Sequence, residues 1–243
     1  MSTPQFSIVI PARNEAESLA DVVNEIATVL AGQSFEIVVV DDGSTDNTGA
    51  VLRMLAGQHA NLRHVAHRES CGKSAAILTG VRMAHADMIC TLDGDGQNDP
   101  RAIMPLLSLA SEEGVALAAG QRVKHAHSSL KRIGSKFANG LRSRMLRDNT
   151  RDTACGLKAL RKDVFLQLPY FDTMHRFLPA LVLREGFEVR HLDVIDRPRR
   201  HGESKYGVLD RALTGALDLI GVRWLVGRRK SVPQSTEVPA KRP

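Results

Sequence analysis

The segment FEIVVVDDGSTDNT (35–48) has the pattern of a buried strand that ends in a polar turn. Its strand-like run at 36–40 is β-branched from Ile37 to Val40. Acidic and hydroxyl side chains, which are common in turns and at helix N-termini, follow it directly. The same order, an apolar run and then a polar cluster, occurs at 6–17 and 88–100. We therefore expect parallel strands with polar residues at their carboxyl ends, the edge at which open α/β sheets bind ligands.

Apolar runs alternate with helical segments throughout the first half of the chain. This pattern predicts an α/β fold with a Rossmann-like, mostly parallel central sheet and helices on both faces. Strands are expected at 6–10, 36–40, 62–66, 88–92 and 115–119, and helices near 15–31, 45–56, 73–86 and 100–112. Beyond residue 122 the pattern predicts a basic helix near 129–147, a turn at 148–156, mixed elements to 197 and a final amphipathic helix near 208–228. The expected organisation is thus one domain over 1–207, a C-terminal amphipathic helix over 208–230 and a disordered tail over 231–243.

Length and composition are those of an ordinary globular protein, with 243 residues, 43% hydrophobic and 25% charged. Cys71, Cys90 and Cys155 form no C-x-x-C pair, so the sequence indicates neither a disulfide framework nor a structural zinc site. The N-terminal residues lack a basic segment followed by a long apolar one, and no apolar run approaches the roughly 20 residues of a spanning helix. These features predict a cytoplasmic protein that meets a membrane only from outside.

A formal net charge of +6 indicates an anionic partner. The basic excess is concentrated between 122 and 162, a stretch that contains twelve Lys and Arg residues and only two acidic residues, Asp148 and Asp152. Two Tyr, one Trp and seven Phe offer few rings for base stacking, and no recognition motif for nucleic acid is present. Anionic lipid or phosphate is therefore the expected partner, and nucleic acid is not.

Asp93 and Asp95 flank Gly94 at an expected strand end, where an extended backbone would direct both carboxylates to the same side. Two converging carboxylates without a basic neighbour suit a hard divalent cation such as Mg²⁺ or Mn²⁺. The segment is not an EF-hand, because Asn98 and Met104 stand where Gly and Glu are required.

Two nucleotide-binding motifs are also excluded. Gly72-Lys73-Ser74 is not the end of a P-loop, because the first glycine of that motif is replaced by His67. No G-x-G-x-x-G follows the first strand, which argues against a nicotinamide or flavin site. Lys73 is therefore expected to be a solvated residue that opens a helix.

Three segments in series resemble family-2 glycosyltransferases of the GT-A fold: SIVIPARNE (7–15), VVVDDGSTD (38–46) and LDGDGQNDP (92–100). Three more are similar to the branch that makes dolichyl- and polyprenyl-phosphate sugars: CGKSAAILTGV (71–81), RDTACGLKALRKDVF (151–165) and RPRRHGESKYG (197–207). The resemblance covers about residues 6 to 207. It implies a metal-dependent enzyme with a nucleotide-sugar donor.

The resemblance assigns site residues position by position. Those for the nucleotide sugar are Pro11, Arg13, Glu15, Val40, Asp42, Asp93, Gly94 and Asp95. Those for the metal ion are Asp95 and Gln97. Arg122, Arg199 and Lys205 are implied to contact phosphate groups and to act in catalysis with Asp93 and Asp95. Lys131, Arg132 and Ser135 are implied for the acceptor phosphate.

The chemistry of a phosphate acceptor is consistent with these assignments. A divalent ion and cationic side chains neutralise a leaving nucleoside diphosphate. A phosphate monoester has a second pKa near 6 and needs no general base at neutral pH. Asp152 is either a turn residue or a base, and the sequence leaves both readings open.

The expected function is inverting transfer from a GDP- or UDP-sugar to polyprenyl phosphate, with Mg²⁺ or Mn²⁺, by a protein held peripherally at the cytoplasmic face of a membrane. Three alternatives are weighed against it: a family-2 enzyme with a hydroxyl acceptor, a non-catalytic membrane-surface module, and a sugar-1-phosphate nucleotidyltransferase, which should carry a Gly-rich phosphate loop. In the final helix, an apolar stripe indicates either an anionic membrane surface or docking against the core. The stripe consists of Leu209, Leu213, Leu217, Ile220 and Trp224.

Overall fold

The protein, described here from a computed structural model, is built on a seven-stranded sheet with the order β3-β2-β1-β4-β6-β5-β7. The structure describes residues 3–123, 140, 142–198 and 208–228, and within 208–214 only the backbone. The strands are β1 (Phe6–Ala12), β2 (Phe35–Asp41), β3 (Leu62–Ala66), β4 (Met88–Thr91), β5 (Val115–Val123), β6 (Lys158–Arg161) and β7 (Glu188–Ile195). All their pairings are parallel except those of β6, which runs antiparallel to β4 and β5.

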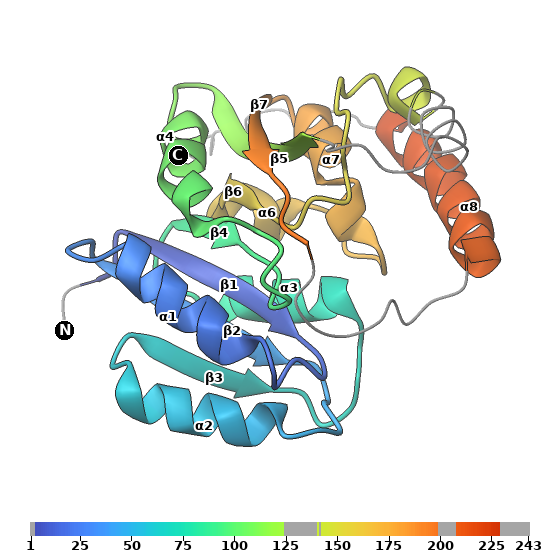
Figure 1. Ribbon diagram of the computed structural model, residues 1–243. Coiled ribbons are helices and arrows are strands. Elements are labelled where there is room, and N and C mark those ends of the chain that lie inside the picture. Colours follow the sequence, from blue (N-terminus) through green and yellow to red (C-terminus); the bar gives the residue numbers. More distant parts are fainter. Residues whose placement is uncertain (1–2, 124–139, 141, 199–207, 229–243) are drawn as a thin grey trace, which may run out of the picture.

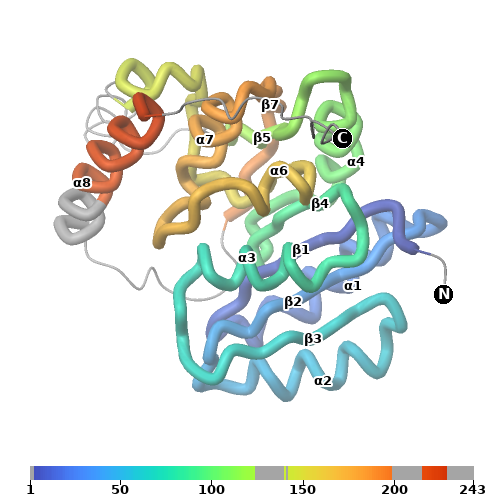
Figure 2. Tube along the Cα trace, turned by 180° about the vertical axis from the view of Figure 1, so that it is seen from behind, coloured from blue at the N-terminus to red at the C-terminus, as the bar shows by residue number. Residues whose placement is uncertain are grey.

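Helices cover both faces of this sheet (Figures 1 and 2). They are α1 (Leu19–Val29), α2 (Thr48–Gln58), α3 (Lys73–Met83), α4 (Ile103–Ala110), α6 (Lys162–Gln167), α7 (Leu178–Arg184) and α8 (Val208–Gly227), with short 3₁₀ turns at Pro100–Ala102 and Met174–Arg176. Residues 140 and 142–146 are also helical. The predicted α/β fold with a mostly parallel, two-sided sheet is confirmed.

The strand sequences explain why both faces are covered. Every residue of β1 is buried, because alternate side chains enter opposite cores. Ile8 and Ile10 pack with α1, α2 and α4 on one face, whereas Val9 packs with α3, α6 and α7 on the other. Each such side chain contributes roughly 1.5–3 kcal/mol when it is fully buried. The sheet is thereby a rigid base for the loops at its edges.

Helix α8 lies against the second of these cores and contacts α7. Val222 is 2% exposed and belongs to the same cluster as Leu181, while Leu217, Ile220 and Trp224 on its outer side are 63%, 62% and 62% exposed. Core docking and an exposed apolar face thus coexist on one helix. None of the described helices is long and apolar enough to cross a lipid bilayer.

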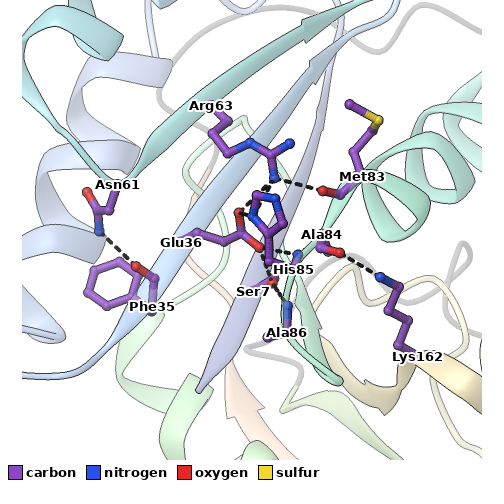
Figure 3. A network of polar contacts seen from close by, with 10 residues as sticks. All are labelled: Ser7, Phe35, Glu36, Asn61, Arg63, Met83, Ala84, His85, Ala86 and Lys162. Atoms are coloured by element: carbon purple, nitrogen blue, oxygen red, sulfur yellow. Dashed lines mark hydrogen bonds and ion pairs between the residues drawn. The ribbon is translucent and has the colours of Figure 1, made fainter. Parts of the chain in front are cut away.

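At the amino end of the strands, a buried carboxylate ties three strands together (Figure 3). Glu36 accepts hydrogen bonds from Ser7 Oγ (2.6 Å), Arg63 Nη1 (2.8 Å) and the backbone of His85 (2.5 Å). Burial raises the pKa of Glu36, but these donors outweigh it and hold the pKa at about 2. This edge is therefore structural, and it lies opposite the edge that carries the site.

Two features of the fold were not predicted. The pattern beyond residue 122 gave no individual strands, and β6 inserts antiparallel between β4 and β5. This strand was missed because Lys158–Arg161 is too short to show a period of its own. Helix α1 begins at Leu19 rather than near 15, because residues 13–18 form turns tied to the loop after β2. The tail at 231–243 lies outside the described residues.

Candidate functional site

The carboxyl ends of β1, β2, β4, β5 and β7 lie at one edge of the sheet, since these strands share one direction. The three polar clusters predicted at strand ends therefore meet there. Asn14 joins the first two, because its backbone nitrogen donates to Ser44 Oγ at 2.9 Å and its side-chain oxygen accepts from Thr45 N at 2.8 Å. Ser18 Oγ donates to Gly94 O at 2.7 Å and joins the first cluster to the third.

The DGD segment at 93–95 forms a tight turn. Strand β4 stops at Thr91, residues 94 and 95 are in a turn, and Gln97 N donates to Asp95 Oδ1 at 3.1 Å. Asp93 N donates to Asn98 Oδ1 at 3.0 Å and closes the loop. The expectation of an extended strand end at Asp93 and Asp95 is thus wrong, because the backbone turns at residues 94 and 95 after β4 has ended.

Asp93 has a basic neighbour, contrary to expectation. Lys73 Nζ, at the start of α3, donates to Asp93 Oδ1 at 2.6 Å, so Lys73 is not merely a solvated residue. The Asp93 carboxylate also presses on Gly156, where an added Cβ would lie 2.2 Å from Oδ1. A side chain at position 156 would displace the carboxylate.

A side chain at position 94 would also collide with a carboxyl group. A Cβ there would lie 2.1 Å from Glu15 Oε2. The Glu15 carboxyl group therefore lies directly against the DGD turn, and its assignment to the donor site stays a prediction.

The end of β7 is attached to the same turn. Arg197 N donates to Gln97 O at 3.0 Å, and Gln97 Nε2 donates to Arg197 O at 3.3 Å. The Arg197 guanidinium pairs with Asp99 at 3.0 Å and with Glu25 at 2.8 Å. The hydrogen bond from Gln97 Nε2 to Arg197 O fixes the orientation of the Gln97 amide. The side-chain oxygen of Gln97 is then the atom that could bind a cation.

Asp196 is the residue that this attachment brings to the site. Its Oδ1 is buried and makes no hydrogen bond with any described residue. Burial raises the pKa of Asp196, and the nearby carboxylates of Asp152, Asp95 and Asp93 raise it further against the lowering effect of Arg122. The site therefore concentrates negative charge that a divalent cation would neutralise.

The residues at the turn fit Mg²⁺ or Mn²⁺. These ions favour oxygen ligands, and Mg²⁺ is usually held by one or two carboxylates together with substrate phosphates. Asp95 and Gln97 supply such oxygens, with Asp196 nearby. Donor phosphates would complete the coordination of an ion held there.

Arg122, at the end of β5, forms a partly buried ion pair with Asp152. Arg122 Nε donates to Asp152 Oδ2 at 2.6 Å, and Nη1 lies 3.8 Å from Asp196 Oδ2. The hydrogen bond to Asp152 raises the pKa of Arg122. Burial raises the pKa of Asp152, but Arg122 outweighs it and the pKa is lowered. Asp152 is thus an ionised partner of Arg122, and it also closes a turn by accepting from Ala154 N at 3.1 Å.

The expected nucleotide residues lie around the ends of β1 and β2. Pro11 pairs in register with Val40, and Arg13 is exposed beyond them. The side chain of Val40 is completely buried against Val38 and Ala76, so only its backbone can face a ligand. Asp42 follows β2 and accepts bonds from the loop at 70–72.

A cavity of about 530 Å³ opens beside Arg122, between β5, β7, Gly140 and residues 143–152. Polar residues contribute to its wall, although most of the lining surface is apolar; they are Gln121, Ser143, Asn149, Thr150 and Asp193. It adjoins the Arg122–Asp152 pair and so lies next to the acidic site. Sequence patterns gave no sign of it.

Most described Lys and Arg residues between 122 and 162 form hydrogen bonds or ion pairs within the protein. Arg142 is buried with Asp148, Arg151 bonds Gln121 and Asp193, and Lys162 Nζ donates to Ala84 O at 2.6 Å. Burial lowers the pKa of Lys158, whose ammonium group donates to the carbonyls of Thr153 and Cys155. The stretch is therefore less available to an anionic partner than its charge count indicated. Arg199, Lys205, Lys131, Arg132 and Ser135 lie outside the described residues and stay predictions.

Sequence reasoning missed Asp196, Gly156, Asn98 and the pairing role of Lys73. Lys73 is 20 residues from Asp93, so only the topology of the sheet brings them together. Asp196 follows a strand with no strong alternation of buried and exposed residues. The sequence signal that could have identified Asp196 is its position directly before the RPRRHG segment (197–202).

The family described as "Glycosyl transferase family 2" matches residues 7–168. The chain belongs to this glycosyltransferase family. In fold it is similar to GT-A enzymes, among them glucosyl-3-phosphoglycerate synthase from Mycobacterium tuberculosis, solved with Mn²⁺ and UDP. That match has a TM-score of 0.68 at 19% identity and covers 94% of this chain and 82% of the other.

Two relatives in sequence are named for polyprenyl-phosphate sugars. Dodecaprenyl-phosphate galacturonate synthase from Rhizobium johnstonii is 33% identical over 94% of this chain and 69% of its own length. Undecaprenyl-phosphate 4-deoxy-4-formamido-L-arabinose transferase from Edwardsiella ictaluri is 34% identical over 85% of this chain and 65% of its own length. The chain thus spans about two thirds of the length of these relatives.

Proposed function

We propose that this protein transfers a sugar, with inversion, from a nucleoside diphosphate sugar to a polyprenyl phosphate. The observation that carries the proposal is the meeting of the DGD turn with Asp196 and the Arg122–Asp152 pair at the carboxyl edge of the sheet. The names of the sequence relatives support the acceptor, because each specifies a polyprenyl phosphate. Uridine and guanosine diphosphate sugars both remain donor candidates.

In this proposal, the ends of β1 and β2 bind the nucleotide and the DGD turn holds its diphosphate. Bound Mg²⁺ or Mn²⁺ would neutralise charge that develops on the leaving diphosphate, as in metal-assisted transfers generally. Asp95 and the side-chain oxygen of Gln97 would hold the ion. Lys73 keeps Asp93 in place beside them.

In this proposal, Arg122 orients the acceptor phosphate. The acceptor oxygen forms a bond to the anomeric carbon while the bond to the diphosphate oxygen breaks, and the diphosphate leaves with the electron pair. A phosphate monoester is mostly dianionic at neutral pH and loses no proton in this step. The lowered pKa of Asp152 and its bond to Arg122 argue against a role as base. Arg199 and Lys205 are proposed further phosphate contacts, and Lys131, Arg132 and Ser135 proposed acceptor contacts.

A peripheral position at the cytoplasmic face of an anionic membrane completes the proposal. The outer face of α8 offers Leu217, Ile220 and Trp224 at helical spacing, and Arg228 lies 5.5 Å from the centre of the Trp224 ring. Apolar and aromatic side chains next to cations suit the headgroup region of anionic lipid. This face would bring the site to its lipid acceptor.

A donor and acceptor panel tests the function. The protein is incubated with UDP- and GDP-linked hexoses, uronic acids and pentoses, Mn²⁺, and either a short polyprenyl phosphate or the corresponding polyprenol. Mass spectrometry should find a glycosylated product with the phosphate and none with the alcohol. Product on a hydroxyl acceptor instead would favour the hydroxyl-specific alternative, and a blank with folded protein across the panel would favour a non-catalytic module.

A further inference from the structure

A second group of metal-ligating side chains lies at the end of β2, away from the DGD turn. Among the described residues, Asp42, His67 and Cys71 have one ligand atom each within 4.8 Å of the others. Their chemistry differs from that of the DGD turn, because a thiolate and an imidazole favour a softer ion than Mg²⁺. We propose that Asp42, His67 and Cys71 bind zinc and that zinc bound there competes with the nucleotide donor.

Asp42 is fixed in a position suited to a ligand. Its Oδ2 accepts from Ser70 Oγ at 2.8 Å and from Gly72 N at 2.9 Å, and its Oδ1 accepts from Cys71 N at 2.8 Å. These bonds outweigh burial and lower the pKa of Asp42, so the carboxylate is ionised at neutral pH. They also bring Cys71 beside the carboxylate.

His67 has the surroundings of a metal ligand. Its Nδ1 lies 2.8 Å from Asp42 Oδ1, and its Nε2 lies 2.9 Å from Thr79 Oγ1. A ligating histidine almost always donates its second ring N–H to an oxygen, which fixes the tautomer. The Thr79 hydroxyl can accept that proton when Nδ1 binds zinc, and it can donate to Nε2 when zinc is absent.

Cys71 completes a set that zinc favours. Its side chain is exposed, whereas Cys90 and Cys155 are buried. Zinc would replace the proton on His67 Nδ1, and this proton would move to His67 Nε2. The proton of the Cys71 thiol would pass to solvent. Three protein ligands leave the fourth tetrahedral position open.

The effect on the donor rests on the proposed function, in which Asp42 contacts the nucleotide. Zinc held on Asp42 Oδ1 occupies the carboxylate at the position where the base and ribose would lie. The protein would then bind its donor with Mg²⁺ or Mn²⁺ at the DGD turn and lose the donor when zinc occupies the second site.

Cobalt titration tests the site without any activity measurement. Co²⁺ added to the full chain should give a thiolate-to-cobalt charge-transfer absorption, and excess Zn²⁺ should remove it. Cys71→Ser and His67→Gln should lose the band, Thr79→Val should weaken cobalt affinity about 10- to 100-fold, and the control His59→Gln should match the wild type. Absence of the band in the wild type, or its survival in Cys71→Ser, would overturn the site.

Calorimetry of UDP and GDP with Mg²⁺, with and without Zn²⁺, tests the competition. Zinc should weaken nucleotide binding to the wild type about tenfold or more and leave Cys71→Ser unaffected. Equal inhibition of both proteins would overturn the competition. A cobalt band together with no nucleotide binding under any condition would contradict the proposed function and leave the zinc site standing.

Discussion

Lys73 Nζ lies 2.6 Å from Asp93 Oδ1, and this ion pair joins the start of α3 to the DGD turn. Both side chains are partly exposed, so the pair contributes at most about 1 kcal/mol to folding. Its consequence is positional, because Gly156 also lies against the same carboxylate. Asp93 is thus in contact with both a cation and a residue that has no side chain.

Lys73→Ala should lower kcat/KM about tenfold, or about 1.4 kcal/mol of transition-state stabilisation, because Asp93 would no longer be held in position at the DGD turn. Steady-state kinetics with the donor and acceptor that give product would measure it. Arg161→Ala, which removes a surface pair with Asp163, is the matched control and should keep wild-type rates. Unchanged kinetics for Lys73→Ala would mean that the pair does not position Asp93.

The pH profile of transfer should rise through the second ionisation of the acceptor phosphate, near pH 6, and then remain level. Asp152→Asn should lower the rate modestly, because Arg122 loses a charged partner, and should leave the midpoint of the rise in place. Rates from pH 5 to 9 would measure both. A collapse of several thousandfold with acceptor binding preserved would instead identify Asp152 as the base.

Glu36→Gln should destabilise the fold more at pH 7 than at pH 3. The folded-state pKa of about 2 lies below the ordinary value of 4.5, so this stabilisation is complete above about pH 4.5 and is lost as pH falls towards 2. A shift of this size corresponds to about 3 kcal/mol at neutral pH. Urea unfolding at both pH values would test it, with the exposed Glu188→Gln as control. An equal loss at both pH values would contradict the ionised network of Figure 3.

Replacing Leu217, Ile220 and Trp224 together with Ser should reduce binding to anionic vesicles and leave the unfolding temperature nearly unchanged, because all three side chains point outward. Cosedimentation with vesicles of phosphatidylglycerol and phosphatidylcholine would measure it. Met54→Ser, which alters an exposed apolar side chain on α2, is the control. Wild-type binding by the triple variant would move the membrane contact away from α8.

The first half of the fold could be predicted from the sequence because its strands are buried on both faces and read as continuous apolar runs, as in Ile37 to Val40. The strand β6 could not, because four residues that pair antiparallel with β4 and β5 carry no local signal of their own. The chain direction there is decided by contacts with two strands that are distant in the sequence, as in the pairs Cys90–Ala159 and Ala118–Ala159.

The site residues likewise include some that the sequence could predict and some that it could not. Asp93, Asp95 and Gln97 belong to one contiguous segment, so a motif could identify them. Asp196 reaches them through hydrogen bonds between Arg197 and Gln97, which are 100 residues apart. Such a contact depends on the register of β7 with β5 rather than on any local pattern.

The most direct test of the account compares wild type and Asp95→Asn in the transfer assay with polyprenyl phosphate, Mn²⁺ and the productive donor. Asn keeps an oxygen for the Gln97 N–H and removes the charge, so the unfolding temperature should stay close to that of the wild type. Product formation should fall by about 100- to 1000-fold, and excess chelator should abolish it in the wild type. Full activity of Asp95→Asn, or of the wild type in chelator, would contradict a metal-dependent transfer at the DGD turn.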